Sequence, residues 1–186
     1  MKTKFILLLM LLFSSSYVYS QIKIDESFDN KLIIIGNISS GAAMNLLAYN
    51  GVGPALQEHR LYCRIFEDKV TYGIYVSTGN RFDDNFEFAL GTDINKAKES
   101  INTILTFMKN SDTGKSIKVT DEDNRLIQID YNNRAGIALT VVNNTDNAII
   151  CDKVVLTKKN LERALKLLDD KAEAKVQKAI EKSKQK

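Results

Sequence analysis

The chain has 186 residues, of which 44% are hydrophobic and 26% charged, and its formal net charge is +3. A domain of this length buries a sizeable core, so the fold requires neither a structural metal nor a dense disulfide scaffold. Two cysteines and one proline exclude a disulfide-rich scaffold and a proline-rich linker.

The first twenty residues have the pattern of a secretory signal peptide. Two lysines precede an apolar run at 5–13, and the compact residues Val18 and Ser20 stand three and one positions before a cut at Gln21. The apolar run is too short to cross a bilayer, which takes about 20 residues. We therefore expect removal of residues 1–20 and export of a soluble chain, without a transmembrane segment, to the periplasm or the medium.

The next part of the chain predicts four strands and then a helix. The strands are expected at 31–38, 60–67, 70–78 and 86–90, because these segments are apolar runs or alternate apolar with polar residues. Thr92 or Asp93 then caps a helix whose apolar residues recur every three or four positions as far as Met108. A short helix or loop is inserted at 41–50.

The second half repeats this order. Strands are expected at 116–120, 126–131, 136–142 and 148–156, and Asp121 to Asn124 form the turn between the first two. Thr157 is the expected N-cap of the last helix. Beyond Leu168 its apolar stripe is mostly alanine, so we expect the end of this helix to project from the core, since small side chains bury little area.

Two successive strand-and-helix groups predict an α+β fold in which antiparallel sheets of about eight strands are covered by two amphipathic helices. The order indicates a duplicated ββββα unit, as an architectural interpretation only. Some folds that bind single-stranded nucleic acid share this plan, but a fold does not determine function. The chain thus divides into the signal peptide at 1–20, one domain at 21–170, and a basic extension of the C-terminal helix at 171–186.

Charge separates that extension from the rest. Residues 158–186 contain ten basic and five acidic residues, so a basic tail follows a mildly acidic body. In an exported protein this favours an envelope component or an acidic protein as partner, and not nucleic acid. The alternative is that the lysines only keep a long helix in solution.

The residues that carry chemistry form no recognisable catalytic motif, and none implies a cofactor or a metal. Cys63 and Cys151, one in each unit, are candidates for a disulfide in an oxidising compartment, with two buried thiols as the alternative.

The single histidine, His59, lies in an expected loop outside any nucleophile motif. The acidic turn lacks the glycine and glutamate of a calcium loop, so a solvated hairpin turn is expected there.

We therefore favour a non-enzymatic binding or assembly module that acts in the cell envelope. One expected partner surface lies in the segment 41–60, which is apolar but broken by glycines, and a second on the basic end of the last helix. Two alternatives stay open: a carrier of an apolar ligand with an internal cavity, and a hydrolase using two carboxylates about 5 to 10 Å apart. The candidate partner residues are Met44, Leu47, Tyr49, Lys175, Lys178 and Lys182, and the candidate carboxylates are Asp83, Asp84, Glu87, Asp121, Glu122 and Asp123.

Overall fold

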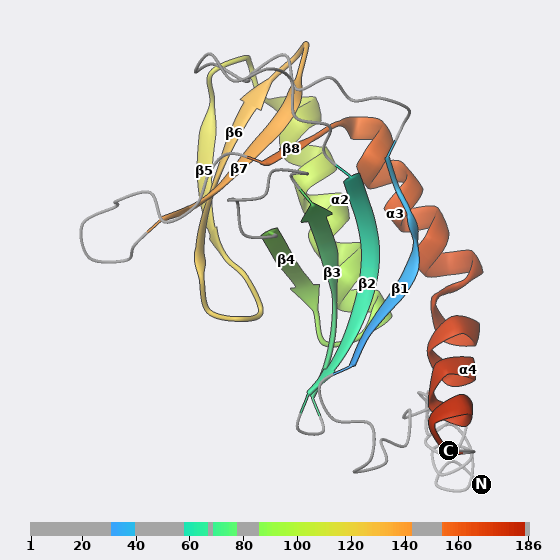
Figure 1. The fold of residues 1–186 in the computed structure, drawn as a ribbon. Helices are drawn as coiled ribbons and strands as arrows, with labels where there is room; N and C mark the ends of the chain where they lie inside the picture. Colours follow the sequence, from blue (N-terminus) through green and yellow to red (C-terminus); the bar gives the residue numbers. More distant parts are fainter. Residues whose placement is uncertain (1–30, 40–57, 67–68, 78–85, 143–153, 185–186) are drawn as a thin grey trace, which may run out of the picture.

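The computed structural model describes residues 31–39, 58–66, 69–77, 86–142 and 154–184, and Figure 1 shows their arrangement. Two four-stranded antiparallel sheets are each followed by helix, which confirms the α+β fold and the repeated ββββα order. The first unit consists of β1 (Lys31–Asn37), β2 (Glu58–Phe66), β3 (Lys69–Ser77), β4 (Phe86–Gly91) and α2 (Ile94–Asn110). The second consists of β5 (Ser116–Thr120), β6 (Leu126–Asn132), β7 (Gly136–Val142), β8 (Val154–Leu156), α3 (Lys158–Asp170) and α4 (Ala172–Lys184).

The first sheet is a meander with strand order β1-β2-β3-β4. Alternate residues of β2 share one face, and the register places Leu61 opposite Ile74 and Cys63 opposite Tyr72. All four side chains are buried, as expected where alternate residues face a core. His59 is the first buried residue of this row, so the expected loop at this position is wrong: β2 already includes it.

The second sheet has the order β5-β6-β7-β8. Ile127 pairs with Val141 and Ile129 with Leu139, and all four are buried. The predicted alternation of β6 is therefore confirmed. The last strand is described only from Val154 onward, so residues 148–153 of the expected strand lie outside the described part of the chain.

Helix α2 begins at its predicted cap. The side chain of Asp93 accepts a hydrogen bond from the backbone N–H of Lys96, which satisfies one of the free donors of the first turn. The helix contacts β4 and α3, and Figure 1 shows it behind β3 and β4. Its buried residues recur at helical spacing and join one hydrophobic cluster with both sheets: Ala97, Ile101, Ile104 and Met108.

The C-terminal helix is divided at Lys171, the C-cap of α3, and continues as α4. Thr157 caps α3 as predicted. Helix α4 contacts β1, beside which it lies in Figure 1. Ala172, Val176 and Ile180 are buried, whereas the sequence predicts that side chains beyond Leu168 leave the core. The spacing of these three residues continues the stripe, and contact with β1 compensates for their small size.

Among the described residues, no helix has the length and apolar character needed to cross a membrane.

Candidate binding site

Three of the candidate carboxylates meet at the junction of the two sheets. Arg64 of β2 donates to Glu87 of β4 at 2.9 Å and to both carboxylate oxygens of Asp123 at 2.7 and 2.8 Å. Asp123 belongs to the turn between β5 and β6, which carries Asp121 and Arg125 as well. We call these five residues the inter-sheet ion-pair cluster. Asp83 and Asp84 lie outside the described residues, and the side chain of Glu122 is not part of the cluster.

Asp121 organises the turn. Its carboxylate accepts the backbone N–H groups of Asp123 and Arg125 at 3.0 and 2.9 Å, and Nε and Nη2 of Arg125 at 2.9 and 2.7 Å. Arg125 also donates to the backbone carbonyl of Glu87. The Asp121 side chain is 0% exposed, so the expectation of a solvated turn is wrong. The turn is instead held against β4 of the first sheet.

The cluster attaches the β5–β6 turn to the first sheet. Its carboxylates are bound by guanidinium groups, so they are not available as a free acid and base. Burial alone would lower the pKa of Arg64, but its hydrogen bond to Asp123 and the nearby carboxylates raise the pKa overall. Within the described part of the chain, no group of three or more His, Cys, Asp or Glu is placed to hold a metal ion.

A pocket of about 710 Å³ opens at the other end of the second unit, between the C-terminal half of α2, the turn from β6 to β7, and the start of α3. Four cationic residues from these three elements line it: Lys109, Arg134, Lys158 and Lys159. Among the described residues that line the pocket, none is acidic. The apolar part of the wall is formed by Leu105, Met108, Tyr131 and Ala135, and the remaining lining residues are Asn102, Thr106, Asn133, Gly136 and Thr157.

Local hydrogen bonds hold the turn of the pocket in shape. The side chain of Asn132 accepts the backbone N–H groups of Arg134 and Ala135 at 2.9 and 3.2 Å, an arrangement that favours a tight turn. Gly136 follows with a φ of 100°, a conformation that glycine adopts without steric cost. The ring of Tyr131 meets Phe107 of α2 edge to face at 6.2 Å. Arg134 is thus presented on a braced turn.

The start of α3 is fixed equally well. Asn160 and Thr157 form a capping box in which each side chain binds the backbone N–H of the other. The amide nitrogen of the Asn160 side chain also donates to the carbonyl of Ile38 at 2.8 Å. Lys158 and Lys159 therefore project from a helix end that is anchored to the end of the first strand, and the helix dipole adds positive partial charge there.

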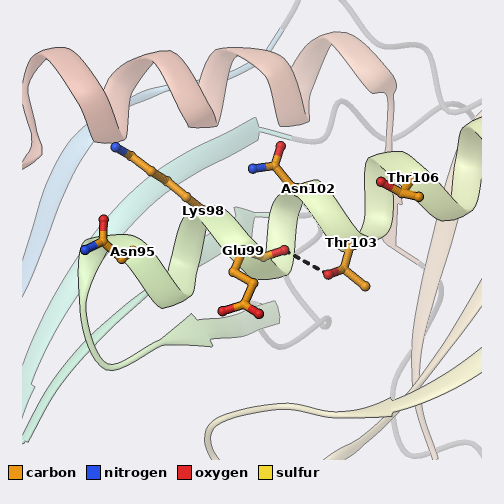
Figure 2. Close-up of a pocket in the computed structure, with 6 residues that line it drawn as sticks. All are labelled: Asn95, Lys98, Glu99, Asn102, Thr103 and Thr106. Carbon is orange, nitrogen blue, oxygen red and sulfur yellow. Dashed lines mark hydrogen bonds between the residues drawn. The ribbon is translucent and has the colours of Figure 1, made fainter.

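A second hollow, of about 510 Å³, runs along one face of α2. Figure 2 shows its six lining side chains, which follow one another along the helix. The hydroxyl of Thr103 donates to the backbone carbonyl of Glu99 at 2.9 Å, and Lys98 pairs with Asp169 of α3. These side chains come from a single helix and converge on no common point, so we regard this hollow as ordinary helix surface.

The predicted partner surface is only partly described. Lys175, Lys178 and Lys182 are exposed on α4, where their spacing of three and four residues places them along one side of the helix. Met44, Leu47 and Tyr49 lie outside the described residues. The four cations of the pocket are functional candidates that the sequence interpretation missed, because single exposed Lys and Arg residues in separate elements give no local signal.

Cys63 is buried and free, and burial raises the pKa of its thiol to about 12. Cys151 lies outside the described residues, so the disulfide between them stays a prediction.

His59 joins the sheets through its Nε2, which lies 2.8 Å from the carbonyl of Val155 in β8. Burial lowers the pKa of His59 although that hydrogen bond opposes the shift.

Comparison with protein-family models, with curated proteins and with solved structures finds no match to this chain. The function is therefore argued from the geometry of the site.

Proposed function

We propose that this protein is an exported, non-enzymatic binding module of the cell envelope, and that the pocket between α2, the β6–β7 turn and α3 holds its ligand. The observation that carries the proposal is the lining of this pocket, where four cations from three elements meet and no acidic side chain of the described part of the chain joins them. The volume of about 710 Å³ lies within the range of small-molecule sites. Export rests on the signal-peptide pattern of residues 1–20.

The two alternatives have different support. Against a carboxylate-dependent hydrolase stands the pairing of Glu87, Asp121 and Asp123 with arginine, although the candidates Asp83 and Asp84 lie outside the described residues. A carrier of an apolar ligand would require an internal cavity between the sheets and the helices, and the pocket described above opens at the surface instead. Its half-buried Leu105, Tyr131 and Ala135 offer apolar contact at that surface, so the carrier remains the second candidate.

The test is native mass spectrometry of the protein recovered after export from its own cells. We expect a chain that begins at Gln21 and carries a bound small molecule. Thr106 is an exposed pocket residue of α2, so Thr106→Trp should fill the pocket from the helix side and remove the bound mass. Thr103→Trp is the matched control, because Thr103 is exposed on the same helix but does not line this pocket. A ligand retained by the Thr106 variant, or a protein without any ligand, would contradict the proposal.

A further inference from the structure

Resting on the proposed function, we propose that the ligand is an organic anion with an apolar body, such as a medium-chain carboxylate. Its charged group would meet the cationic side of the pocket, and its apolar part would cover the wall formed by Leu105, Met108, Tyr131 and Ala135. The pocket thus brings a charged and an apolar surface together.

The described residues do not neutralise the cations of the pocket. Lys158 lies 3.6 Å from Glu162, but the two side chains are 70% and 52% exposed, and such pairs contribute little. Lys109, Arg134 and Lys159 have no described carboxylate within ion-pair distance. By contrast, Arg64 and Arg125 are paired closely with the carboxylates beside them. Like charges gathered from three separate elements repel one another, so an anion placed among them is stabilised.

The apolar wall excludes a purely ionic ligand. Leu105, Tyr131 and Ala135 are half-buried and accessible from the pocket, and Met108 is 8% exposed beneath them. Phosphate alone would reach the cations but leave this surface in water. A neutral hydrocarbon would cover the wall but leave the positive charges uncompensated. An amphiphilic anion satisfies both, and apolar contact contributes about 25 cal/mol for each Å² covered.

The experiment titrates the purified protein with decanoate by isothermal calorimetry, with 1-decanol and inorganic phosphate as probes that each lack one half of the chemistry. Vesicles of an anionic phospholipid form the fourth arm, because the same chemistry occurs at a membrane surface. We expect decanoate to bind at least tenfold more tightly than decanol or phosphate, and the vesicles to bind no better than neutral ones.

Charge variants locate the site. The double variant Arg134→Gln/Lys159→Gln should weaken decanoate binding by tenfold or more, because it removes two of the four cations and hydrogen bonds to charged groups are stronger than those between neutral groups. The matched control is Lys96→Gln/Lys166→Gln, which removes the same charge from exposed positions of α2 and α3 outside the pocket. The control should bind as the unmodified protein does.

The outcomes separate this inference from the proposed function. If decanol binds as tightly as decanoate and Thr106→Trp abolishes both, the pocket is a ligand site but the anionic ligand is wrong. The same conclusion follows if phosphate equals decanoate. If decanoate binds and neither the charge variant nor Thr106→Trp changes it, both proposals fail. Absence of decanoate binding, or binding to anionic vesicles alone, overturns the inference in favour of another ligand or a membrane surface.

Discussion

The inter-sheet ion-pair cluster and the cationic pocket contain similar side chains but use them in opposite ways. In the cluster, Arg64 and Arg125 are each bonded to carboxylates at 2.9 Å or less. In the pocket, four cations share one hollow, and the lining residues that the structure describes include no carboxylate. Opposite charges at short distance attach two parts of the fold, whereas like charges at an open surface provide attraction for a molecule from outside. The positions of the carboxylates therefore distinguish a structural cluster from a candidate site.

The largest expected effect follows from removing Asp121, which the cluster cannot replace. Asp121→Ala removes the nearest carboxylate partner of Arg125 and leaves two backbone N–H groups without an acceptor. We expect a loss of about 3 kcal/mol in the free energy of unfolding, as for other broken buried pairs. Urea denaturation measures it, with the pocket variant Lys159→Gln as the control that should stay within about 0.5 kcal/mol. Equal losses of stability in the two variants would contradict a structural role for the cluster that the pocket residues lack.

A second effect concerns the pocket wall. A Cβ on Gly136 would lie 2.3 Å from the carbonyl oxygen of Leu156 and 2.9 Å from Cα of Thr157, both of them backbone atoms. Gly114 also has a positive φ, of 91°, but nothing lies within 4 Å of its Cβ position. Gly114→Ala therefore measures conformational strain alone, about 1 kcal/mol.

Gly136→Ala should cost about 2 kcal/mol more than that control, because the backbone of β8 has to move as well. Since Leu156 precedes the cap of α3, the shift should also displace Lys158 and Lys159 and weaken decanoate binding. Chemical denaturation and calorimetry of both variants make the comparison. Equal stability of the two alanine variants would show that the start of α3 is not held as tightly as the structure indicates.

The fold was predictable where its signals are local. The alternation through Leu126 to Tyr131 and the helical spacing of Leu161 and Leu168 depend on neighbouring residues only. The role of the acidic turn was not predictable, because its partner Arg64 stands 59 residues from Asp123. The same holds for the bond from Asn160 to Ile38, 122 residues apart. The cationic pocket also depends on contacts between distant parts of the sequence, since its charges converge only after both sheets have formed.

His59 offers a pH test of the junction between the sheets. Its Nε2 donates to Val155, and within the described residues its Nδ1 has no partner. Because burial lowers the pKa of His59, the folded protein keeps this histidine neutral at a pH where the unfolded chain binds a proton. The associated stability is present above the unfolded pKa of about 6.5 and is lost as the pH falls toward the folded pKa.

We expect the free energy of unfolding to decrease by at most about 1.4 kcal/mol per pH unit in that interval. Urea denaturation between pH 7 and pH 5 measures the slope. His59 is the only histidine in the chain, so His59→Gln should flatten the dependence above the range where carboxylates titrate. An unchanged slope in that variant would assign the effect to other groups.

The smallest effects come from double-mutant cycles on one ion pair from each region. Arg64 and Asp123 are about a quarter exposed and joined by two hydrogen bonds, so we expect a coupling energy of about 1 kcal/mol. Lys158 and Glu162 are mostly exposed and farther apart, so we expect about 0.3 kcal/mol, falling further as added salt screens the charges. Alanine cycles by urea denaturation at low and high salt give both values. A coupling between Lys158 and Glu162 as large as that in the cluster would mean that Lys158 is already neutralised by its neighbour, and the pocket would then have less positive charge to offer an anion.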